Sequence, residues 1–561
     1  MKQQNKWINF IIAIAVLIVI NVLGQYVFHR FDFTSDKRFT LSEKTKSILE
    51  KNEKPIIITV FLKGELPPAF KRLQAAVSDI LSDYKAYSKA NFKLVYIDPL
   101  AGLSTQEQDT VIYNLAQNGI EATRTTLKTE SGSTEKLVVP MAMIESNGKQ
   151  MPVKLLQNFN VVGSYEENIN RSIENLEYTL TSSLKKVING YNSRIGFTES
   201  NGELSDLQLY DARASLANNY VVGRVDLNTI TKEGLDKLNM MVIAKPKKPF
   251  TETEKYKINY FVMKGGRVLW SIDQVSAELD SLRGRGGQMA TNNNLNLDDM
   301  LFMYGGRINY NIIADPANSA EIPVSTGAAG GAGQMQLLPW IYYPILLPDT
   351  IHSVVKNLDG IKSEFPGTVD TIGAKGVTKS YILSTSPYNK VYNTPKPFSL
   401  QMVAEQLNPK EFQSVPQNVG ILLEGSFPSV FAGRPLPAGI TAPFTSELTS
   451  KPSKMIIIGD GDVFKNQVSE KDGSPFPLGF DRYSQRTYGN KALLLNVVDY
   501  FTDEDNLIAL RNKEVKIRLL DKAKIKLEKT KWQFINVVAP LLLLIFFAIF
   551  QHYYRKYKYA K

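Results

Sequence analysis

The sequence of 561 residues contains no cysteine and only three histidines. Without cysteine the chain cannot form a disulfide, a thiolate nucleophile, or a cysteine-based zinc or iron–sulfur site. His29 and His552 lie beside long apolar segments, which leaves His352 without a histidine partner for a metal cluster or a Ser-His-Asp triad. The phosphate-binding pattern Gly-x-x-x-x-Gly-Lys-Ser/Thr is also missing. The sequence therefore predicts no catalytic residue, no cofactor and no metal.

The positive charge of the chain is unevenly distributed. The formal net charge is +11, yet residues 511–531 alone carry nine basic and three acidic side chains, and both terminal tails carry only basic ones. These stretches adjoin the apolar segments, where anionic lipid headgroups attract lysine and arginine. We therefore expect contact with membrane lipid and no nucleic-acid partner.

Two segments are long and apolar enough to cross a bilayer. Residues 7–28 contain no charge and span about 33 Å as a helix. A cleaved signal peptide is the alternative, but the apolar run is long and no small-residue cleavage site follows it. Residues 532–551 form the second segment, in which Pro540 is tolerable because neighbouring groups satisfy the freed carbonyl.

Both terminal tails are short and basic, so the positive-inside rule places both in the cytoplasm. The central part of the chain would then lie in the periplasm, outside the inner membrane of a bacterial cell. The basic stretch 511–531 opposes this orientation, but long translocated domains are largely exempt from the rule.

The region 51–190 follows a juxtamembrane connector, 29–50, and reads as an α/β domain. Its order of strands and helices is βαβαββα, which is thioredoxin-like, but Gly64-Glu65-Leu66-Pro67-Pro68 stands where that fold's redox pair of cysteines would be. The expected strands are 55–62, 92–98, 136–145 and 149–155, and the expected helices are 68–89, 104–118 and 164–189.

The region 191–505 reads as a second α/β domain, because strands and helices alternate as in a parallel sheet covered on both faces. An insertion at about 275–450 interrupts the pattern, and its Gly-, Asn- and Ala-rich stretches predict mobile loops. The connector 506–531 is basic and helical in pattern; it is either a solvated stalk or a helix on the membrane surface or a partner. The expected strands are 194–198, 221–227, 239–244, 267–272 and 454–459, and the expected helices are 204–218, 251–264 and 490–501.

Two loops follow strands of this second region at the edge where open α/β sheets usually bind ligands. The alternative is ordinary turn chemistry, because Asn-Gly and Gly-Asp are common turn residues. The candidate ligand or partner residues are Glu199, Ser200, Asn201, Gly202, Glu203, Gly459, Asp460 and Asp462.

Several stretches resemble the auxiliary components of ABC-2-type transporters. They are Phe31–Thr34 with Arg38–Ser42, Ile195–Glu203, Ile456–Asn466, Ile517–Asp521 and the final proline- and leucine-containing apolar segment. The resemblance covers nearly the whole chain and is closest to GldG-type gliding-motility proteins, whose body is related to the GIFT domain of an intraflagellar-transport protein. Asn201 stands where that family often has histidine.

The resemblance implies association with an ABC-2-type permease subunit and a separate cytoplasmic ATPase subunit that serve gliding motility. It also implies that the second domain is a flavodoxin-like or glutamine-amidotransferase-like shell without a nucleophile. We therefore expect a non-catalytic accessory subunit whose extracytoplasmic domain contacts cargo or envelope partners. An extracytoplasmic receptor for a sugar or peptide, and a structural envelope scaffold, remain as alternatives.

Overall fold

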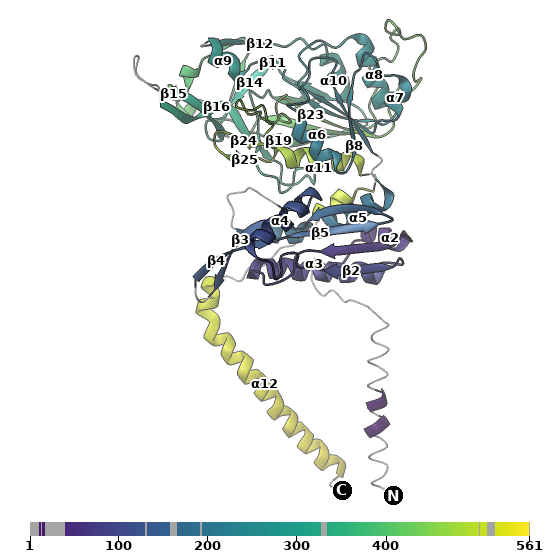
Figure 1. Cartoon of the computed structure of the whole chain (residues 1–561), viewed down its shortest axis with the longest axis vertical. Coiled ribbons are helices and arrows are strands. Elements are labelled where there is room, and N and C mark those ends of the chain that lie inside the picture. The colour runs from purple at the N-terminus through teal and green to yellow at the C-terminus, as the bar shows by residue number, and fades with distance from the viewer. Residues whose placement is uncertain are drawn as a thin grey trace. The chain divides into compact units, whose positions relative to one another are not determined.

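The chain divides into two compact units, residues 1–513 and 514–561, in a computed structural model (Figure 1). The predicted membrane segment 7–28 lies mostly outside the described residues, although residues 10–12 and 14–16 are helical. The connector 29–50 is described from residue 40 onwards, and residues 513–521 of the basic connector lie outside. The structure describes residues 10–12, 14–16, 40–129, 132–157, 165–190, 193–285, 287–326, 334–503, 505–512 and 522–559.

A four-stranded mixed sheet with helices forms the first α/β region. Its strand order is β2-β1-β5-β6, with β2 parallel to β1, and β5 and β6 antiparallel to their neighbours. The elements are α2 (Glu43–Lys51), β1 (Ile56–Val60), α3 (Pro68–Tyr87), β2 (Phe92–Tyr96), α4 (Thr105–Gln117), β3 (Thr123–Thr129), β4 (Gly132–Val138), β5 (Met141–Ser146), β6 (Lys149–Lys154) and α5 (Tyr165–Asn189).

Local sequence signals set several boundaries of this region. Ser42 caps α2, since its Oγ accepts a hydrogen bond of 3.2 Å from the backbone N–H of Thr45. Asn147 and Gly148 both have positive φ, 52° and 75°, and join β5 to β6 in a two-residue hairpin turn, for which Asn-Gly is a favoured pair. The expected helix 68–89 corresponds to α3, and one face of it is apolar and buried: Phe70, Leu73, Val77, Leu81 and Tyr84 are each 0% exposed.

The predicted strand 136–145 was wrong. Residues up to Val138 belong to β4, which pairs with β3 in a separate hairpin, and β5 begins only at Met141. Pro140 lies between them, and it has no backbone N–H to continue a ladder. Its carbonyl instead accepts a hydrogen bond of 3.0 Å from Leu155.

The second α/β region is built on a larger sheet. Its parallel part runs β8-β7-β9-β10-β23, with every neighbouring pair in parallel register. The elements of this part are β7 (Arg194–Thr198), α6 (Tyr210–Ala217), β8 (Val221–Val225), α7 (Lys232–Asp236), β9 (Met240–Ala244), α8 (Glu252–Met263), β10 (Arg267–Ser271), β23 (Ser453–Ile458) and α11 (Asn490–Thr502).

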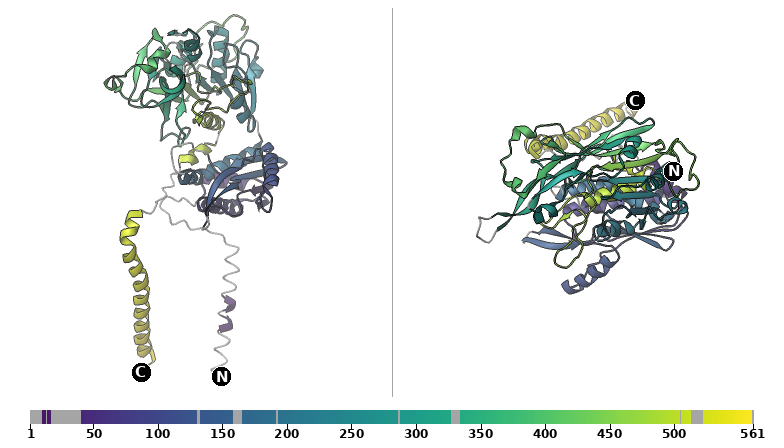
Figure 2. Two further views of the ribbon diagram at one scale, coloured as in Figure 1. Left: turned by 60° about the vertical axis from the view of Figure 1, so that its left-hand side comes forward. Right: turned by 90° about the horizontal axis from the view of Figure 1, so that it is seen from above.

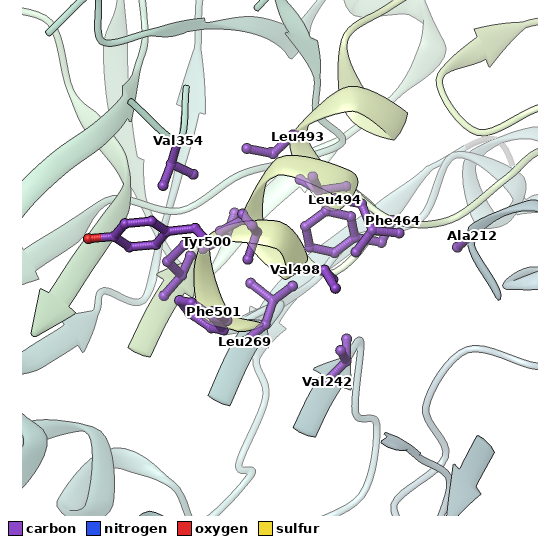
Figure 3. Close-up of a cluster of buried hydrophobic side chains, with 14 of the residues drawn as sticks. Ala212, Val242, Leu269, Val354, Phe464, Leu493, Leu494, Val498, Tyr500 and Phe501 are labelled. Atoms are coloured by element: carbon purple, nitrogen blue, oxygen red, sulfur yellow. The ribbon is translucent and has the colours of Figure 1, made fainter. Parts of the chain in front are cut away.

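Side chains alternate between the two faces of these strands, as the period of two requires. Val242, Leu269 and Ile456 face a core that includes α6 and α11, whereas Ile243 and Trp270 face a core that includes α8. Figure 3 shows Leu493, Leu494, Val498 and Phe501 of α11 gathered near Val242 and Leu269. The predicted two-faced cover of the parallel strands is confirmed.

The strands expected to be parallel are parallel, but the insertion at 275–450 also adds strands of its own to the sheet. β22 (Asn418–Gly425) of that insertion pairs antiparallel with β23, and β19 (Val377–Ser384), β16 (Gln334–Pro348) and β15 (Ser319–Thr326) continue the sheet (Figure 2). Val419–Leu423 is buried throughout. The insertion thus covers the edge of β23, whose unpaired backbone would otherwise be exposed.

The insertion and the chain that follows contain further short elements. They are β11 (Val275–Ser276), α9 (Leu279–Arg285), β12 (Gln288–Asn292), α10 (Asp298–Tyr304), β13 (Gly306–Ile308), β14 (Asn311–Ala314), β17 (Ile361–Lys362), β18 (Val369–Thr371), β20 (Lys390–Asn393), β21 (Lys396–Phe398), η1 (Leu400–Ala404), η2 (Pro409–Phe412), β24 (Phe480–Asp481), β25 (Arg486–Thr487) and η3 (Leu507–Asn512). The glycine- and alanine-rich stretch 327–333 lies outside the described residues.

The predicted helix 204–218 also differs, because α6 begins only at Tyr210. The preceding residues make other bonds: the Leu204 N–H donates to the Ala244 carbonyl at 3.2 Å, and the Ser205 N–H donates to Gln208 Oε1 at 3.0 Å. Polar side chains that bond nearby backbone groups compete with helix formation.

The second compact unit contains one helix among its described residues, α12 (Lys522–Tyr559), which continues through Pro540. Within it, Glu528–Lys558 is long and apolar enough to cross a membrane, by length and composition. None of its most apolar window is buried in the structure. This agrees with the predicted segment 532–551.

Candidate functional site

Four charged side chains follow three neighbouring parallel strands and meet at the carboxyl edge of the sheet. Lys245 follows β9, Asp273 follows β10, and Asp460 and Asp462 follow β23. Carboxylate oxygens of the three aspartates lie within 4.8 Å of one another. The sheet, rather than any local motif, brings these residues together.

Lys245 neutralises this group of acids from within. Its Nζ bonds Asp462 Oδ2 and lies 3.3 Å from Asp273 Oδ2 and 3.1 Å from Glu278 Oε1. Lys245 is only 4% exposed. Gly461 permits the approach, because a Cβ there would lie 2.7 Å from Lys245 Cγ.

A second lysine completes the network. Lys465 Nζ lies 2.5 Å from Asp462 Oδ1 and 3.2 Å from Glu364 Oε2, so Asp462 is held between two ammonium groups. We call Lys245, Asp273, Asp460, Asp462 and Lys465 the strand-end cluster. Three carboxylates at one site need positive charge nearby. A metal ion could supply it, but here the lysine side chains do.

Burial and charge pull the cluster's pKa values apart. Burial alone raises the pKa of Asp462, but Lys245 and Lys465 outweigh it and hold that pKa well below its usual range. Burial raises the pKa of Asp273 to about 6. Burial also raises the pKa of Asp460, and the charges of Asp273 and Asp462 add to this effect. Burial lowers the pKa of Lys245, but Asp462, Asp273 and Glu278 together raise it well above its ordinary value.

Asp460 has a structural role at the turn after β23. It is fully buried, and its two oxygens accept hydrogen bonds from the backbone N–H groups of Asp462 at 2.7 Å and Glu364 at 2.8 Å. Gly459 bonds Gly367 through its carbonyl at 2.7 Å. The predicted loop 459–462 therefore ties the parallel strands to the insertion.

The other predicted loop is joined to the chain after β9 rather than to Asp460. Asn201 donates from Nδ2 to the Pro249 carbonyl at 3.2 Å and to Glu254 Oε2 at 3.3 Å, and its carbonyl accepts from the Lys247 N–H at 2.8 Å. Gly202 has a φ of +73°. Glu203 Oε2 accepts from the Asn201 N–H at 2.6 Å.

The remaining two residues of this loop bond β8 and the chain directly after it. Glu199 pairs with Arg224 at 3.0 Å, and Ser200 Oγ accepts from the Leu227 N–H at 2.6 Å. Within the described residues, no hydrogen bond or ion pair joins loop 199–203 directly to loop 459–462. Lys245–Lys248 lies between them, since Lys245 bonds Asp462 and Lys247 bonds Asn201.

Sequence reasoning missed Lys245, Asp273, Lys465 and Glu364. Lys245 and Asp273 come directly after correctly predicted strands, so the strand-end rule that selected Asp460 would have selected them too. Glu364 lies in the insertion, 101 residues from Lys465, and no local pattern indicates that contact.

A pocket of about 260 Å³ adjoins the strand-end cluster. Glu278, Glu364 and Lys465 of the network line it, together with Glu321, Tyr343 and Arg482. The wall carries both signs of charge, and several of these charges are already paired: Lys465 bonds Glu364, and Arg482 bonds Glu470. The pocket is therefore polar, with five acidic and three basic side chains in its lining.

A second cluster joins the two α/β regions. Asp499 of α11 accepts from Lys186 Nζ of α5 at 2.8 Å, from the Tyr220 hydroxyl at 2.5 Å and from the Tyr178 hydroxyl at 3.2 Å. Burial raises the pKa of Asp499, but Lys186 and the hydrogen bonds from Tyr220 and Tyr178 together outweigh burial, and the net pKa is lowered. We call these four residues the junction cluster.

These features define an α/β protein in which lysines of the chain itself lie at the usual ligand position, the carboxyl ends of the parallel strands. Its last described helix, α12, is long and apolar enough to cross a membrane. A family model described as an ABC-type uncharacterized transport system matches residues 192–497, more than half of the chain. The chain belongs to this family, which gives it an accessory role in an ABC transport system. A second model, described as a domain of unknown function, matches residues 35–145.

The chain is also similar to individual proteins. An uncharacterized protein of Borreliella burgdorferi is 21% identical over 565 residues, covering 97% of each chain. The mmIFT52 N-terminal domain is 13% identical with a TM-score of 0.31, covering 55% of this chain and 98% of that one. A ThuA-like protein from Bacteroides uniformis is 11% identical with a TM-score of 0.26, covering 56% of this chain and 94% of that one. Both TM-scores are too low to support an argument about fold or function.

Proposed function

We propose that this chain is a non-enzymatic, membrane-anchored subunit that works with an ABC-2-type permease and a cytoplasmic ATPase in a complex needed for gliding motility. Segments 7–28 and 532–551 would anchor it in the inner membrane of a bacterial cell, with both termini cytoplasmic. The body would lie in the periplasm and contact cargo or envelope partners. The basic stretches beside the apolar segments suit anionic membrane lipid.

The strand-end cluster is the observation that favours a non-enzymatic role. Ligands of open α/β sheets bind at the carboxyl ends of the strands. Here the buried side chain of Lys245, which bonds Asp462, lies at the ligand position and neutralises the acids there. A general acid or base needs a reacting group within hydrogen-bond reach, and these aspartates are instead engaged with lysine and backbone.

We assign two domains to the body, 51–190 and 191–505, with the insertion at about 275–450 inside the second. The sheet order β2-β1-β5-β6 supports a thioredoxin-like first domain. The parallel strands β8-β7-β9-β10-β23, covered by helices on both faces, support a flavodoxin-like or amidotransferase-like second domain. Residues 506–531 would connect this body to the second span.

Co-purification tests the proposed function. The full chain, tagged and extracted in mild detergent from its own cells, is expected to bring down a multi-span permease and an ATPase identified by mass. An unrelated single-span protein with the same tag is the control. Recovery of the chain alone, under conditions in which other ABC complexes stay intact, would refute the proposal. Loss of motility on deletion with all ABC-dependent transport unchanged would instead favour a structural scaffold.

The pocket beside the strand-end cluster favours a second candidate function, a receptor for a sugar or peptide. Its volume of about 260 Å³ suits a small polar group. Thermal shift of the full chain against sugars and short peptides would test this. A stabilisation lost in Glu321→Ala but kept in Glu447→Ala, an exposed control, would support a receptor.

A further inference from the structure

Three carboxamide side chains interrupt the apolar part of α12. They are Gln533, Asn536 and Gln551. At about 100° of rotation per residue, these three and Pro540 project within an arc of about 60°. The opposite side of the helix carries Val538, Leu542, Ile545 and Ile549, which suit lipid. The helix therefore has one polar, proline-containing face, which we call the carboxamide face.

Pro540 adds a second polar group at Asn536. In an α-helix the N–H of each residue bonds the carbonyl four residues earlier, and proline has no N–H. The helix continues through Pro540, so the Asn536 carbonyl lacks its intrahelical donor. A free carbonyl oxygen and a carboxamide thus occur at the same residue.

Both groups lie at a depth where water is not available. Trp532 and the Tyr553–Tyr554 pair frame the apolar stretch as interfacial aromatic residues do. Asn536 is four residues inside Trp532, about 6 Å along the helix, and so falls within the hydrocarbon core of about 30 Å. Each unsatisfied polar group there costs several kcal/mol, so a protein contact is needed.

Within its own compact unit, no other described element covers this face of α12. Gln533, Asn536 and Pro540 are exposed, and none of the most apolar window of α12 is buried. A lipid headgroup does not reach this depth. A neighbouring membrane helix does, and polar contacts between such helices are the usual way in which carboxamides are satisfied in a bilayer.

We propose that the carboxamide face of α12 docks against one transmembrane helix of the membrane-embedded transport subunit, and that this helix presents a hydrogen-bond donor level with Asn536. The freed carbonyl can only accept, so the partner residue must carry a hydrogen-bond donor, such as the hydroxyl of Ser or Thr or the amide of Asn or Gln. The choice of the transport subunit as occupant rests on the proposed function. It follows from the family membership of the chain and from the absence of a phosphate-binding loop in its sequence.

Photo-crosslinking of the full chain in native membranes tests the face. A photoreactive side chain is placed at residue 533, 536 or 547 on the carboxamide face, or at 538, 542 or 545 on the lipid face. We expect links from the carboxamide face to one multi-span protein that also co-purifies with the ATPase, and at least about fivefold weaker links from the lipid face. Equal links from both faces, links to a second copy of this chain, or links within the chain would overturn the proposal.

Substitutions give an independent readout. Asn536→Leu removes the carboxamide, and Pro540→Ala restores the N–H that bonds the Asn536 carbonyl. Interhelical hydrogen bonds in membranes average about 0.6 kcal/mol and reach about 1.7, so Asn536→Leu should lower co-recovery of the transport subunit about three- to eighteenfold. Pro540→Ala should lower it less, and Leu542→Ala should leave it unchanged.

The same experiments separate two kinds of failure. If no permease or ATPase accompanies the unmodified chain, the proposed function fails. If both accompany it but Asn536→Leu keeps full recovery, or the links come from Leu542, only the assignment of the face fails. An unchanged melting temperature of the soluble body in Asn536→Leu confirms that its folding is not affected.

Discussion

The strand-end cluster and the junction cluster both hold a carboxylate beside lysine away from bulk water, but they differ in burial and in what they join. Lys245 is 4% exposed and its partners come from strands of one sheet. Lys186 is 21% exposed and reaches from α5 to Asp499 on α11. The Lys245–Asp462 pair of the first cluster is almost fully shielded from water, with each side chain 4% exposed, whereas the Lys186–Asp499 pair of the second is more accessible and can rehydrate more easily. We therefore expect the first to govern folding of the sheet and the second to govern attachment of the two regions.

Lys245→Met should have the largest effect. It leaves Asp462 and Asp273 as buried acids with less compensation, and breaking a buried pair in this way costs about 3 to 5 kcal/mol. Urea unfolding of the full chain in detergent measures the change. Lys247→Met is the matched control: Lys247 is 59% exposed and lies 3.6 Å from the same Glu278, so its loss should cost under about 0.5 kcal/mol. Equal losses of stability in the two variants would contradict the expected difference between the buried Lys245 pair and the exposed Lys247 pair.

Asp273→Asn should change how stability depends on pH. The pKa of Asp273 is about 6 in the folded chain against an ordinary 3.8, so the folded chain binds more protons between those values and gains stability as pH falls through them. Asp273→Asn removes this titration. The free energy of unfolding of the wild type relative to the variant should rise by about 2 to 3 kcal/mol from about pH 6 to about pH 4.

Unfolding curves at several pH values provide the measurement. Glu278→Gln, which also alters the surroundings of Lys245 but leaves Asp273 in place, should keep the wild-type slope. If Asp273→Asn keeps the slope as well, then Asp273 is not the titrating group.

Asp499→Asn should loosen the junction more than it destabilises the sheet. The variant loses the ion pair with Lys186 but can still accept from Tyr220 and Tyr178, so we expect a cost of about 1 to 2 kcal/mol. Hydrogen exchange should accelerate in the C-terminal half of α5 and in α11, with the amides of β9 and β10 unchanged. Glu411→Gln, which breaks an exposed pair with Lys390, is the control. Uniform acceleration through the parallel strands would contradict a role limited to the junction.

Tyr220→Phe should have a smaller effect than Asp499→Asn. It removes one hydrogen bond to Asp499 and leaves the Lys186 pair in place, so the free energy of unfolding should fall by about 1 kcal/mol. Tyr178→Phe removes a longer bond of 3.2 Å from the same carboxylate and should cost less still. Thermal unfolding of both variants beside Asp499→Asn would rank the three contacts, and a larger loss in Tyr178→Phe would reverse the ranking.

Much of the parallel half of the large sheet could be predicted, because its signals are local. The expected strand 454–459 corresponds to β23, and the expected helix 490–501 corresponds to α11, whose Leu493, Leu494, Val497 and Val498 are buried. The antiparallel half could not be predicted in the same way. Composition drew attention to the glycine- and asparagine-rich stretches of 275–450, whereas Val419–Leu423 forms a buried strand only because β23 offers it an edge.

The candidate site was predicted in part for a related reason. Asp460 and Asp462 stand at a strand end that the sequence marks, and the structure places them in the strand-end cluster. Glu199 and Asn201 also stand at a strand end, but their contacts are with Arg224 and the 247–254 stretch. A strand-end position identifies which edge a residue lies on, but not which partner it meets there.

The sequence by itself determined which kinds of chemistry the chain lacks. It also determined the apolar segment of α12 and the alternation of side chains along β7, β9, β10 and β23. Each of these depends on composition or on neighbours a few residues apart. Only the tertiary structure decided that Lys245 meets Asp462, 217 residues away, and that strands of the insertion complete the sheet. Helical and strand periodicity is set by short-range backbone geometry, whereas the pairing of buried charges and free strand edges is settled by packing of the whole chain.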